Sequence, residues 1–597
     1  MDTSQHPLGD PIPAYTEHAI SVSLPKWEDN VMYEESDPRV VSRMQTGYPR
    51  FFIHKTIEKL AQVCVQKLGT PSESAILFPS APIAEACRTF VAIRDVPARV
   101  VALTTPDGPK ASASVFAVLL PTDKFSVGKQ FWQHSGLGIS SRRAEHCLAL
   151  LVRNAPAPAP SPAVRVAGKT ANKHYAAKPA RGAALPSPTS PSTNGFPTAV
   201  DDMESEHATF LEERYGRNLN VCAVSEAKRA LRRRIAGVLV RDDKGEVEVG
   251  VSVRGVAVQE SDVYLYPTGM STIWSAHQVA LSTLGERKSI CFGFPYTDTL
   301  KILEKWGPGC HFLGFGLDES IDELEQILAE EKSKNPDVPP ALALFTEFPS
   351  NPLLRSANLP RLRALADKYD FLIVVDDTIG NFVNVEALPY TDIMVTSLSK
   401  IFSGDANVMG GSLVLNPAGK HYATLKSYLD STYEDIYFDE DAIFMERNSR
   451  DFQRRIRTID DNTLAVCAYL HAVSRAHAAS SPLTRVFYPK YETTANYDAC
   501  RVAGGGYGGL FSLDFVSADA SRAFFDALPC YKGPSLGTNF TLACPYTILG
   551  HYAELPWAAG YGVHPTLVRV SVGLEERAWL LDAFKTAFEA AQAVVAT

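Results

Sequence analysis

Long hydrophobic runs are absent from this chain, which argues against a membrane-spanning protein. No stretch of the 597 residues approaches the roughly 20 consecutive apolar residues that a transmembrane helix needs. Residues 1–20 are polar and contain proline, so they also lack the apolar core of a secretory signal. We therefore expect a soluble, cytoplasmic protein that has no membrane partner.

Regularly spaced cysteines are missing too. The chain has ten cysteines, but they are scattered and no two of them form a C-x-x-C pair. Disulfide frameworks and zinc sites both rely on such repeated spacing. We expect reduced, buried thiols and no metal site.

Strong charge of one sign is the third absence. The formal net charge is −9, so the overall field would attract neither nucleic acid nor an anionic membrane. One basic run, residues 228–234, has leucine and alanine between its charges. We interpret it as the solvated face of a helix and expect no nucleic-acid partner.

What is present is the composition of an ordinary globular protein with one unusual segment. Hydrophobic residues make up 45% of the chain and charged residues 21%. Proline, alanine and serine dominate residues 155–198, which hold too few large apolar side chains to offset the entropy cost of ordering. We divide the chain into an N-terminal arm and accessory region (1–150), a disordered linker (151–204), a large domain (205–418) and a small C-terminal domain (419–597).

Periodicity favours an α/β fold. Within residues 205–418 helical and strand-like patterns alternate, which is typical of a mostly parallel sheet covered by helices on both faces. Farther on, strand patterns at 509–515 and 567–572 precede a helical pattern at 575–593, which indicates a smaller C-terminal domain. In the N-terminal part we expect a helix at 57–67.

Two neighbouring segments suit the demands of pyridoxal phosphate. One apolar run ends in Asp376, and the next one along the chain leads into Ser397, Ser399 and Lys400. The cofactor needs a carboxylate at its pyridine nitrogen, a lysine for a Schiff base with its aldehyde, and hydroxyl or N–H donors for its phosphate. These four residues could meet all three demands. Two ordinary strands with polar ends would give the same pattern, because strand ends in such sheets often carry ligand sites.

Further motifs lie on both sides of this pair. Gly269 and Met270 begin a helical pattern, and the N–H groups at a helix N-terminus form a phosphate cradle. Another strand pattern runs into the turn Glu347-Phe348-Pro349-Ser350-Asn351-Pro352. The tail contributes Ser535-Leu536-Gly537 and a strand pattern that contains Arg569.

In this order and spacing the motifs resemble the Cys/Met-metabolism (trans-sulfuration) family of pyridoxal-phosphate enzymes. The resemblance is strongest to the fungal cystathionine γ-synthases, because residues 47–55 and 292–296 are similar to that subgroup in particular. It implies fold type I, the aminotransferase-like architecture, with a mostly parallel sheet in a large domain and a smaller α+β C-terminal domain. It also implies pyridoxal 5′-phosphate as the cofactor.

The resemblance assigns roles around that cofactor. Lys400 would form the Schiff base and then carry protons, Asp376 would bind the pyridine N–H, and Tyr296 would stack on the ring. The phosphate would be held by four residues, Gly269, Met270, Ser397 and Ser399.

Two more pairs complete the implied site. Tyr48 and Arg50 are similar to a pair that reaches the phosphate from a neighbouring subunit, so we expect a homodimer or homotetramer with shared active sites. Ser535 and Arg569 would bind the α-carboxylate of an amino-acid substrate, for which the guanidinium fork is a natural partner. A buried structural ion pair is the alternative for Arg569.

The long region between Tyr48 and Gly269 departs from the shorter bacterial relatives of this family. Its residues show no motif with a chemical meaning. We expect this region to pack on the outside of the enzyme or to mediate assembly.

The implied reaction is γ-replacement, in which an O-acylated homoserine loses its ester and L-cysteine adds to give L-cystathionine, a step of methionine biosynthesis. Elimination from cystathionine, or replacement by sulfide or by a carbon or amine nucleophile in secondary metabolism, would use the same residues. A scaffold or regulatory paralogue is a third interpretation, against which the joint presence of Lys400, Asp376 and Arg569 argues. The sequence leaves the acyl group, the nucleophile and the oligomer size open.

Overall fold

The computed structural model describes residues 6–49, 52–104, 114–153, 221–241, 247–249 and 252–596. Nearly all of the predicted linker, and Arg50, lie outside these residues. Within the described part, no helix is both long and apolar enough to cross a membrane.

A seven-stranded sheet forms the centre of the large domain. Its strand order is β6-β12-β11-β10-β9-β7-β8, and the neighbours from β11 to β8 all run parallel, whereas β12 is antiparallel to both of its neighbours. The strands are β6 (Val263–Tyr266), β7 (Ser289–Phe292), β8 (Cys310–Leu313), β9 (Ala343–Glu347), β10 (Leu372–Asp376), β11 (Ile393–Ser397) and β12 (Gly411–Leu415). The predicted mostly parallel sheet is therefore confirmed.

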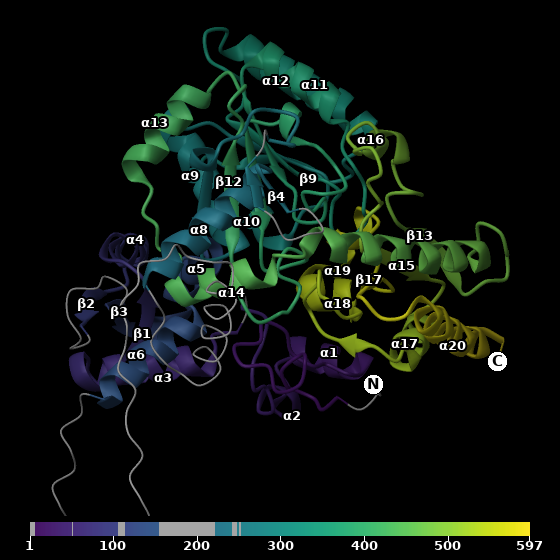
Figure 1. Ribbon diagram of the computed structural model, residues 1–597, viewed down its shortest axis with the longest axis horizontal. Helices are drawn as coiled ribbons and strands as arrows, with labels where there is room; N and C mark the ends of the chain where they lie inside the picture. The colour runs from purple at the N-terminus through teal and green to yellow at the C-terminus, as the bar shows by residue number, and fades with distance from the viewer. Residues whose placement is uncertain are drawn as a thin grey trace, which may run out of the picture.

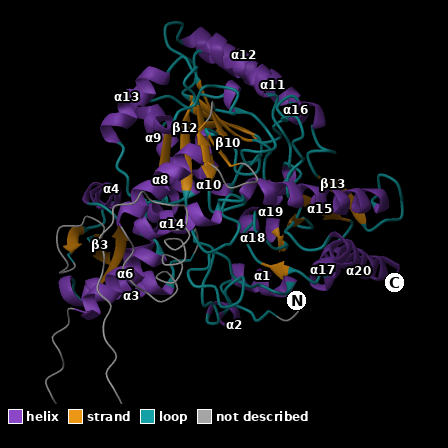
Figure 2. Ribbon diagram, in the orientation of Figure 1, coloured by secondary structure: helices purple, strands orange, loops and turns teal. Residues whose placement is uncertain are grey.

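Helices cover both faces of this sheet, as Figure 2 shows. Side chains of a strand point alternately to its two faces, and β10 follows this rule. Ile373 and Val375 belong to the core beneath α8, α11 and α12, whereas Leu372 and Val374 belong to the core beneath α9, α10 and α13. The helices are α8 (Val221–Ala236), α9 (Gly269–Leu284), α10 (Thr297–Lys305), α11 (Asp318–Lys334), α12 (Leu359–Tyr369) and α13 (Tyr422–Thr432).

The basic run at 228–234 is only in part the solvated face that the sequence predicted, because the side chain of Arg229 is 58% exposed whereas that of Lys228 is 10% exposed. It belongs to α8, whose intervening apolar residues enter the large-domain core. Its charges have acidic partners on the segment that crosses the helix: Lys228 Nζ lies 3.0 Å from Asp435, and Arg234 Nη2 lies 2.9 Å from Glu446. The spacing of charges on a helix does not reveal such partners, because they come from distant sequence.

The C-terminal domain has a second sheet, with strand order β13-β14-β17-β16-β15 and only the short β15–β16 pair parallel. Helices α15, α17 and α20 contribute to its hydrophobic core. The predicted strands at 509–515 and 567–572 are β14 and β17, and the predicted terminal helix is α20. The elements are α14 (Asp439–Asn448), α15 (Phe452–Val473), β13 (Leu483–Phe487), α16 (Thr494–Asp498), β14 (Leu510–Phe515), α17 (Ala518–Ala527), β15 (Tyr531–Lys532), β16 (Leu542–Pro545), α18 (Tyr546–His551), α19 (Leu555–Gly560), β17 (Val568–Ser571) and α20 (Arg577–Ala596).

The N-terminal part forms a small sheet domain of its own, with strand order β1-β3-β2. Successive residues of β1 again face opposite cores, with Leu77 toward α3 and α6 and Phe78 toward α4 and α5. The predicted helix at 57–67 is α3. The elements are α3 (Lys55–Leu68), β1 (Glu73–Phe78), α4 (Ala81–Ala92), β2 (Arg99–Leu103), β3 (Val115–Pro121), α5 (Phe125–Ser135) and α6 (Ser141–Arg153).

An arm precedes this domain and contains α1 (Trp27–Glu34) and α2 (Pro38–Val41). Figure 1 shows it running from the N-terminal domain toward α17 and α18 of the C-terminal domain. Trp27 is buried in the C-terminal core, and the backbone N–H of Leu24 donates to the carbonyl oxygen of Lys532 at 3.0 Å. The N-terminal arm therefore packs against the C-terminal domain.

The N-terminal domain is docked on the large domain through buried contacts. Arg142 Nη1 lies 3.0 Å from an Asp441 carboxylate oxygen, and both side chains are buried. Nearby, the rings of Phe90 and Trp306 stack with their centroids 4.5 Å apart. Such contacts fix the orientation of the small sheet relative to the large one.

Candidate active site

The carboxyl ends of three neighbouring strands meet at one edge of the large sheet. β9, β10 and β11 end at Glu347, Asp376 and Ser397, and the parallel register places Asp376 opposite Glu347. Lys400 follows the last of these strands in a turn. All four residues line one cavity of about 190 Å³. The structure thus brings together Asp376, Ser397 and Lys400, which the sequence singled out first, and adds Glu347 to them.

Lys400 is buried, and its amino group has two hydroxyl partners. Nζ donates to Tyr48 Oη at 3.0 Å and to Ser535 Oγ at 3.2 Å. The segment that carries Ser535 crosses close to the lysine at Gly537, which has φ of +68°. A Cβ at Gly537 would lie 2.8 Å from the Cβ of Lys400, so this crossing requires glycine.

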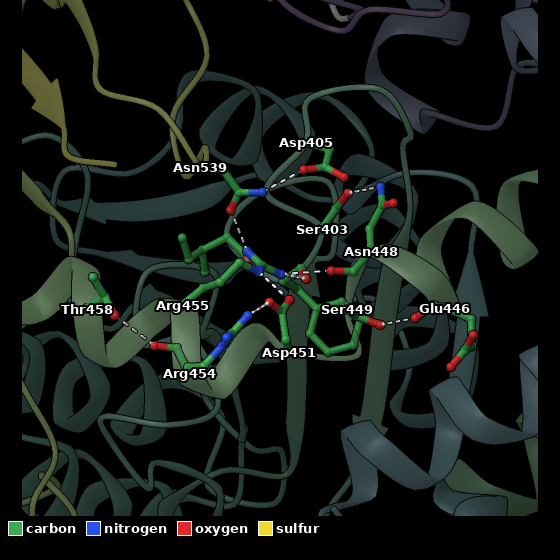
Figure 3. Close-up of polar contacts among 12 residues, drawn as sticks. Ser403, Asp405, Glu446, Asn448, Ser449, Asp451, Arg454, Arg455, Thr458 and Asn539 are labelled. Carbon is green, nitrogen blue, oxygen red and sulfur yellow. Dashed lines mark hydrogen bonds and ion pairs between the residues drawn. The ribbon is translucent and has the colours of Figure 1, made fainter. Parts of the chain in front are cut away.

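The loop after Lys400 is fixed by a buried arginine, Arg455 at the start of α15 (Figure 3). Its guanidinium donates to the carbonyl oxygens of Ile401 and Phe402, both at 3.0 Å, and to Asn539 Oδ1 at 2.7 Å. Asn539 follows the segment that crosses the lysine. One side chain therefore ties both chain segments that frame Lys400.

The carboxyl group of Asp376 is held in place by Thr378. Its Oδ1 accepts from the backbone N–H of Thr378 at 2.9 Å, and Thr378 Oγ1 accepts from the backbone N–H of Ser397 at 2.8 Å. Burial raises the pKa of Asp376, against the hydrogen bonds of Thr378 and the positive charge of Lys400, which lower it. The ion pairs of the described residues include none with this carboxyl group.

A glycine turn at the N-terminus of α9 forms one wall of the cavity. A Cβ at Gly269 would lie 2.5 Å from the Cβ of Ser397, so no side chain fits there. Thr268 caps the helix, because its Oγ1 accepts from the backbone N–H of Ser271 at 3.0 Å. The first N–H groups of a helix have no partner within it, and here Gly269 and Met270 line the cavity.

Ser399 also lines the cavity, but its hydroxyl group is bonded to the backbone of Gly410. Its Oγ donates to the carbonyl oxygen at 3.3 Å and accepts from the backbone N–H at 3.0 Å. A phosphate contact from this hydroxyl group would therefore compete with Gly410.

Arg569 lies on β17 and is oriented entirely by neutral acceptors. Nη1 donates to Asn351 Oδ1, and Nη2 donates to the carbonyl oxygens of Pro534 and Ser535, all at 3.0 Å. The guanidinium also lies over the ring of Tyr546, at 4.9 Å from its centroid. No ion pair found among the described residues involves Arg569, so the structural ion pair considered from the sequence is not observed there.

The two tyrosines predicted for the site both line the cavity. Tyr296 immediately precedes α10, and its backbone N–H donates to a carboxylate oxygen of Glu347. Tyr48 contacts Lys400 of its own chain, and the structure describes a single chain. The expected origin of this tyrosine in a neighbouring subunit therefore stays a prediction.

The N-terminal region supplies one side of the cavity, which corrects the expectation that it packs only on the outside or mediates assembly. Gly136, with φ of +62°, reaches the glycine turn, where its carbonyl oxygen accepts from Thr268 Oγ1 at 3.0 Å. Other residues of the arm and the small domain line the cavity, among them His18, Ile20, His54, Trp132 and Ile139. Nothing in the sequence signals this role, because apolar and aromatic residues of these types occur throughout any core.

Sequence reasoning assigned no role to Glu347, Asn351 or Thr378. Each follows or ends a strand at the same sheet edge as Asp376, and the turn that contains the first two was recognised as a motif. The rule that located Asp376 could therefore have located these residues. Their hydrogen-bond partners, however, are visible only in the fold.

Comparison with known proteins agrees with this arrangement. Residues 260–589 match the model described as "Cys/Met metabolism PLP-dependent enzyme", and residues 56–140 match "Fungal trans-sulfuration enzyme, N-terminal domain". The chain belongs to the Cys/Met-metabolism family of pyridoxal-phosphate enzymes. The predicted family, fold type I architecture and cofactor are confirmed.

The relatives of this enzyme differ in their named activities. It is 50% identical to "Cystathionine gamma-synthase-like enzyme iboG2" of Amanita muscaria, over 99% of this chain and 97% of that one. It is 44% identical to the cystathionine gamma-synthase of Neurospora crassa, over 98% of each chain. "Alanine racemase ungC" of Aspergillus violaceofuscus is 32% identical, over 98% of this chain and 96% of its own length.

The cavity of this enzyme fits the cofactor of its family. Asp376 lines the cavity, and its carboxyl group has no ion pair among the described residues, which suits a pyridine N–H. The turn at Gly269 excludes any side chain beside a helix N-terminus, which suits a phosphate. Lys400 lines the same cavity as these two features, and its Nζ donates to Ser535 Oγ at 3.2 Å.

Proposed function

We propose that this enzyme catalyses γ-replacement on an O-acylhomoserine, most favourably with L-cysteine to form L-cystathionine. The observation that carries the proposal is the convergence of Lys400, Asp376 and Arg569 on one cavity. Similarity over the full length to a cystathionine gamma-synthase supports the choice of reaction.

Pyridoxal phosphate would supply an electron sink and a reactive aldehyde at this site. We propose that Lys400 holds the cofactor through Nζ and, once displaced by substrate, moves protons at Cα and Cβ of the amino acid. Its hydroxyl partners, Tyr48 and Ser535, would orient the free amine. Asp376 would hold the pyridine nitrogen in its protonated form.

The remaining cavity residues would position the cofactor. Tyr296 would present a flat ring that also keeps water away from the reacting atoms. The phosphate would be bound by the glycine turn, by hydroxyl groups and by the pair at the end of the arm; these are Gly269, Met270, Ser397, Ser399, Tyr48 and Arg50.

Arg569 and Ser535 would bind the substrate α-carboxylate. Because the guanidinium is oriented only by neutral acceptors, its charge is available for an anionic ligand. A bidentate hydrogen bond from this fork would fix the amino acid relative to Lys400.

A second candidate is γ-replacement with another nucleophile, such as sulfide or a carbon or amine nucleophile, or γ-elimination of cystathionine. One relative over nearly the whole chain is named an alanine racemase, so similar chains carry more than one named activity. We also propose a homodimer or homotetramer in which Tyr48 and Arg50 complete the site of a neighbouring subunit.

The decisive experiment is product identification. Purified enzyme is incubated with O-acetyl- or O-succinyl-homoserine, together with cysteine, sulfide or no nucleophile, and products are identified by mass. Cystathionine as the main product with cysteine supports the proposal, with Lys400→Ala as the inactive control. Efficient turnover without cysteine, or a preference for sulfide, would replace it by the second candidate.

A further inference from the structure

Glu347 is a buried carboxyl group that bridges two walls of the cavity. It is the last residue of β9, and only 9% of its surface is exposed. One carboxylate oxygen accepts from the backbone N–H of Tyr296, and the other accepts from the backbone N–H of Asn351 at 2.8 Å. Both donors belong to loops that line the cavity.

Each of these two loops carries a residue that lines the cavity. Tyr296 directly precedes α10 and is one of these lining residues. Asn351 connects Glu347 to Arg569, because its Oδ1 accepts from Arg569 Nη1 at 3.0 Å. Glu347 is thus one hydrogen bond from the tyrosine backbone and two hydrogen bonds from the arginine.

The charged groups that act on Glu347 are Asp376 and Arg569, which both line the cavity. Burial and, to a smaller extent, the neighbouring Asp376 raise the pKa of Glu347 to about 8, although the two backbone N–H donors and Arg569 act to lower it. A buried carboxyl group is unfavourable unless it is well bonded. The hydrogen bonds from these two backbone N–H groups offset part of the cost of burying the carboxyl group.

We propose that Glu347 is a positioning residue, which sets Tyr296 over the cofactor ring and, through Asn351, directs Arg569 toward the substrate carboxylate. The inference rests on the proposed roles of Tyr296 and Arg569, but the bridge itself does not depend on which substrate is used.

The bridge is tested first in the cofactor-free protein by hydrogen exchange. Glu347→Gln keeps the shape but has one carbonyl oxygen, and its amide group cannot accept the second N–H. Exchange of peptides covering 293–300 or 348–354 should become about 10- to 100-fold faster. Glu347→Asp, which is too short to reach both loops, should accelerate at least one of them.

Asp460→Asn provides a matched control. Asp460 is also buried and accepts a backbone N–H, that of Gly508 at 3.1 Å, but it does not line the cavity. Its substitution should leave exchange of both peptides unchanged. Unchanged exchange in both Glu347 variants would overturn the proposal, whatever reaction the enzyme catalyses.

The second test separates positioning from general destabilisation by kinetics. Glu347→Gln should raise KM for the amino-acid substrate about tenfold in the wild-type background and by less than about twofold in the Arg569→Ala background. Equal effects in both backgrounds would show that Glu347 does not act through Arg569. The product-identification experiment is independent, so its failure leaves the exchange result standing.

Discussion

The two sides of the cavity are built in different ways. The large-domain side consists of polar residues at strand ends, among them Asp376 and Lys400, each fixed by the sheet beneath it. The N-terminal side consists largely of apolar and aromatic residues, together with the partly buried ring of His18. The first side carries groups that chemistry requires, whereas the second encloses space that many residue types could enclose.

The two sides of the cavity should therefore determine different properties of the enzyme. A cofactor fixes the residue types that bind it, so relatives with different reactions can share the large-domain side. The N-terminal region contributes to the shape of the remaining space, and in the proposed reaction this shape would select the nucleophile. Substitutions on the two sides should therefore have separable effects.

Lys400→Ala should give the largest effect, a loss of at least about 1,000-fold in kcat, because no other group at this position can hold the cofactor and move protons. The visible absorption band of the bound cofactor should disappear as well. Lys420→Ala, at an exposed lysine, serves as the control and should retain both. An active, coloured Lys400→Ala protein would contradict the assignment.

Arg569→Ala should keep the absorption band of the bound cofactor. It should lose about 30- to 3,000-fold in kcat/KM, because removing an arginine that pairs with the substrate carboxylate costs roughly 2–5 kcal/mol. Arg569→Lys should recover only part of this loss, since a point charge lacks the planar fork. Steady-state kinetics with each amino-acid substrate provides the measurement. Unchanged kinetics in Arg569→Ala would place the carboxylate site elsewhere.

Tyr48→Phe should lower kcat/KM by about 10- to 100-fold, because it removes one hydrogen bond to the amino group of Lys400 and keeps the ring. The origin of this tyrosine is tested by co-expressing Tyr48→Ala with Lys400→Ala. If the tyrosine comes from a neighbouring subunit, the hybrid contains one intact site and regains activity. Absence of recovery in a verified hybrid would assign Tyr48 to its own chain.

The smallest expected effect concerns His18 and acid pH. Burial lowers the pKa of His18 from 6.5 to about 3, with Arg142 and His54 contributing, and these outweigh the Glu145 carboxylate 3.0 Å from Nε2. Below pH 6.5 the unfolded chain therefore binds a proton that the folded chain excludes. The free energy of unfolding should fall with decreasing pH, by at most about 1.4 kcal/mol per unit.

Melting temperatures between pH 7 and pH 5 provide the check on this prediction. His18→Gln should show a weaker pH dependence than wild type, whereas His477→Gln, at an exposed ring, should match wild type. Identical slopes in all three proteins would show that His18 does not sense pH.

The sequence was informative where chemistry restricts the choice of residue. Asp376 and Lys400 were located from their positions at predicted strands, and Arg569 from the resemblance to the family; the large sheet and the C-terminal sheet together bring them to one cavity. The parallel sheet itself followed from alternating patterns. These inferences hold because strand periodicity and cofactor demands are both local constraints.

The sequence was uninformative where partners come from distant segments. The basic run in α8 resembles a solvated face until its acidic partners are in place, and the hydroxyl group of Ser399 is bonded to Gly410 across a loop. The wall formed by the N-terminal region carries no motif at all. Only the fold shows that Gly136 touches the glycine turn of the large domain.

The central claim is that the large-domain side holds the cofactor through Lys400. Treating the purified enzyme with sodium borohydride should fix the cofactor covalently to the lysine that carries it. Peptide mass spectrometry should then find the pyridoxyl group on Lys400. A pyridoxyl group on any other lysine, with Lys400 unmodified, would contradict the account.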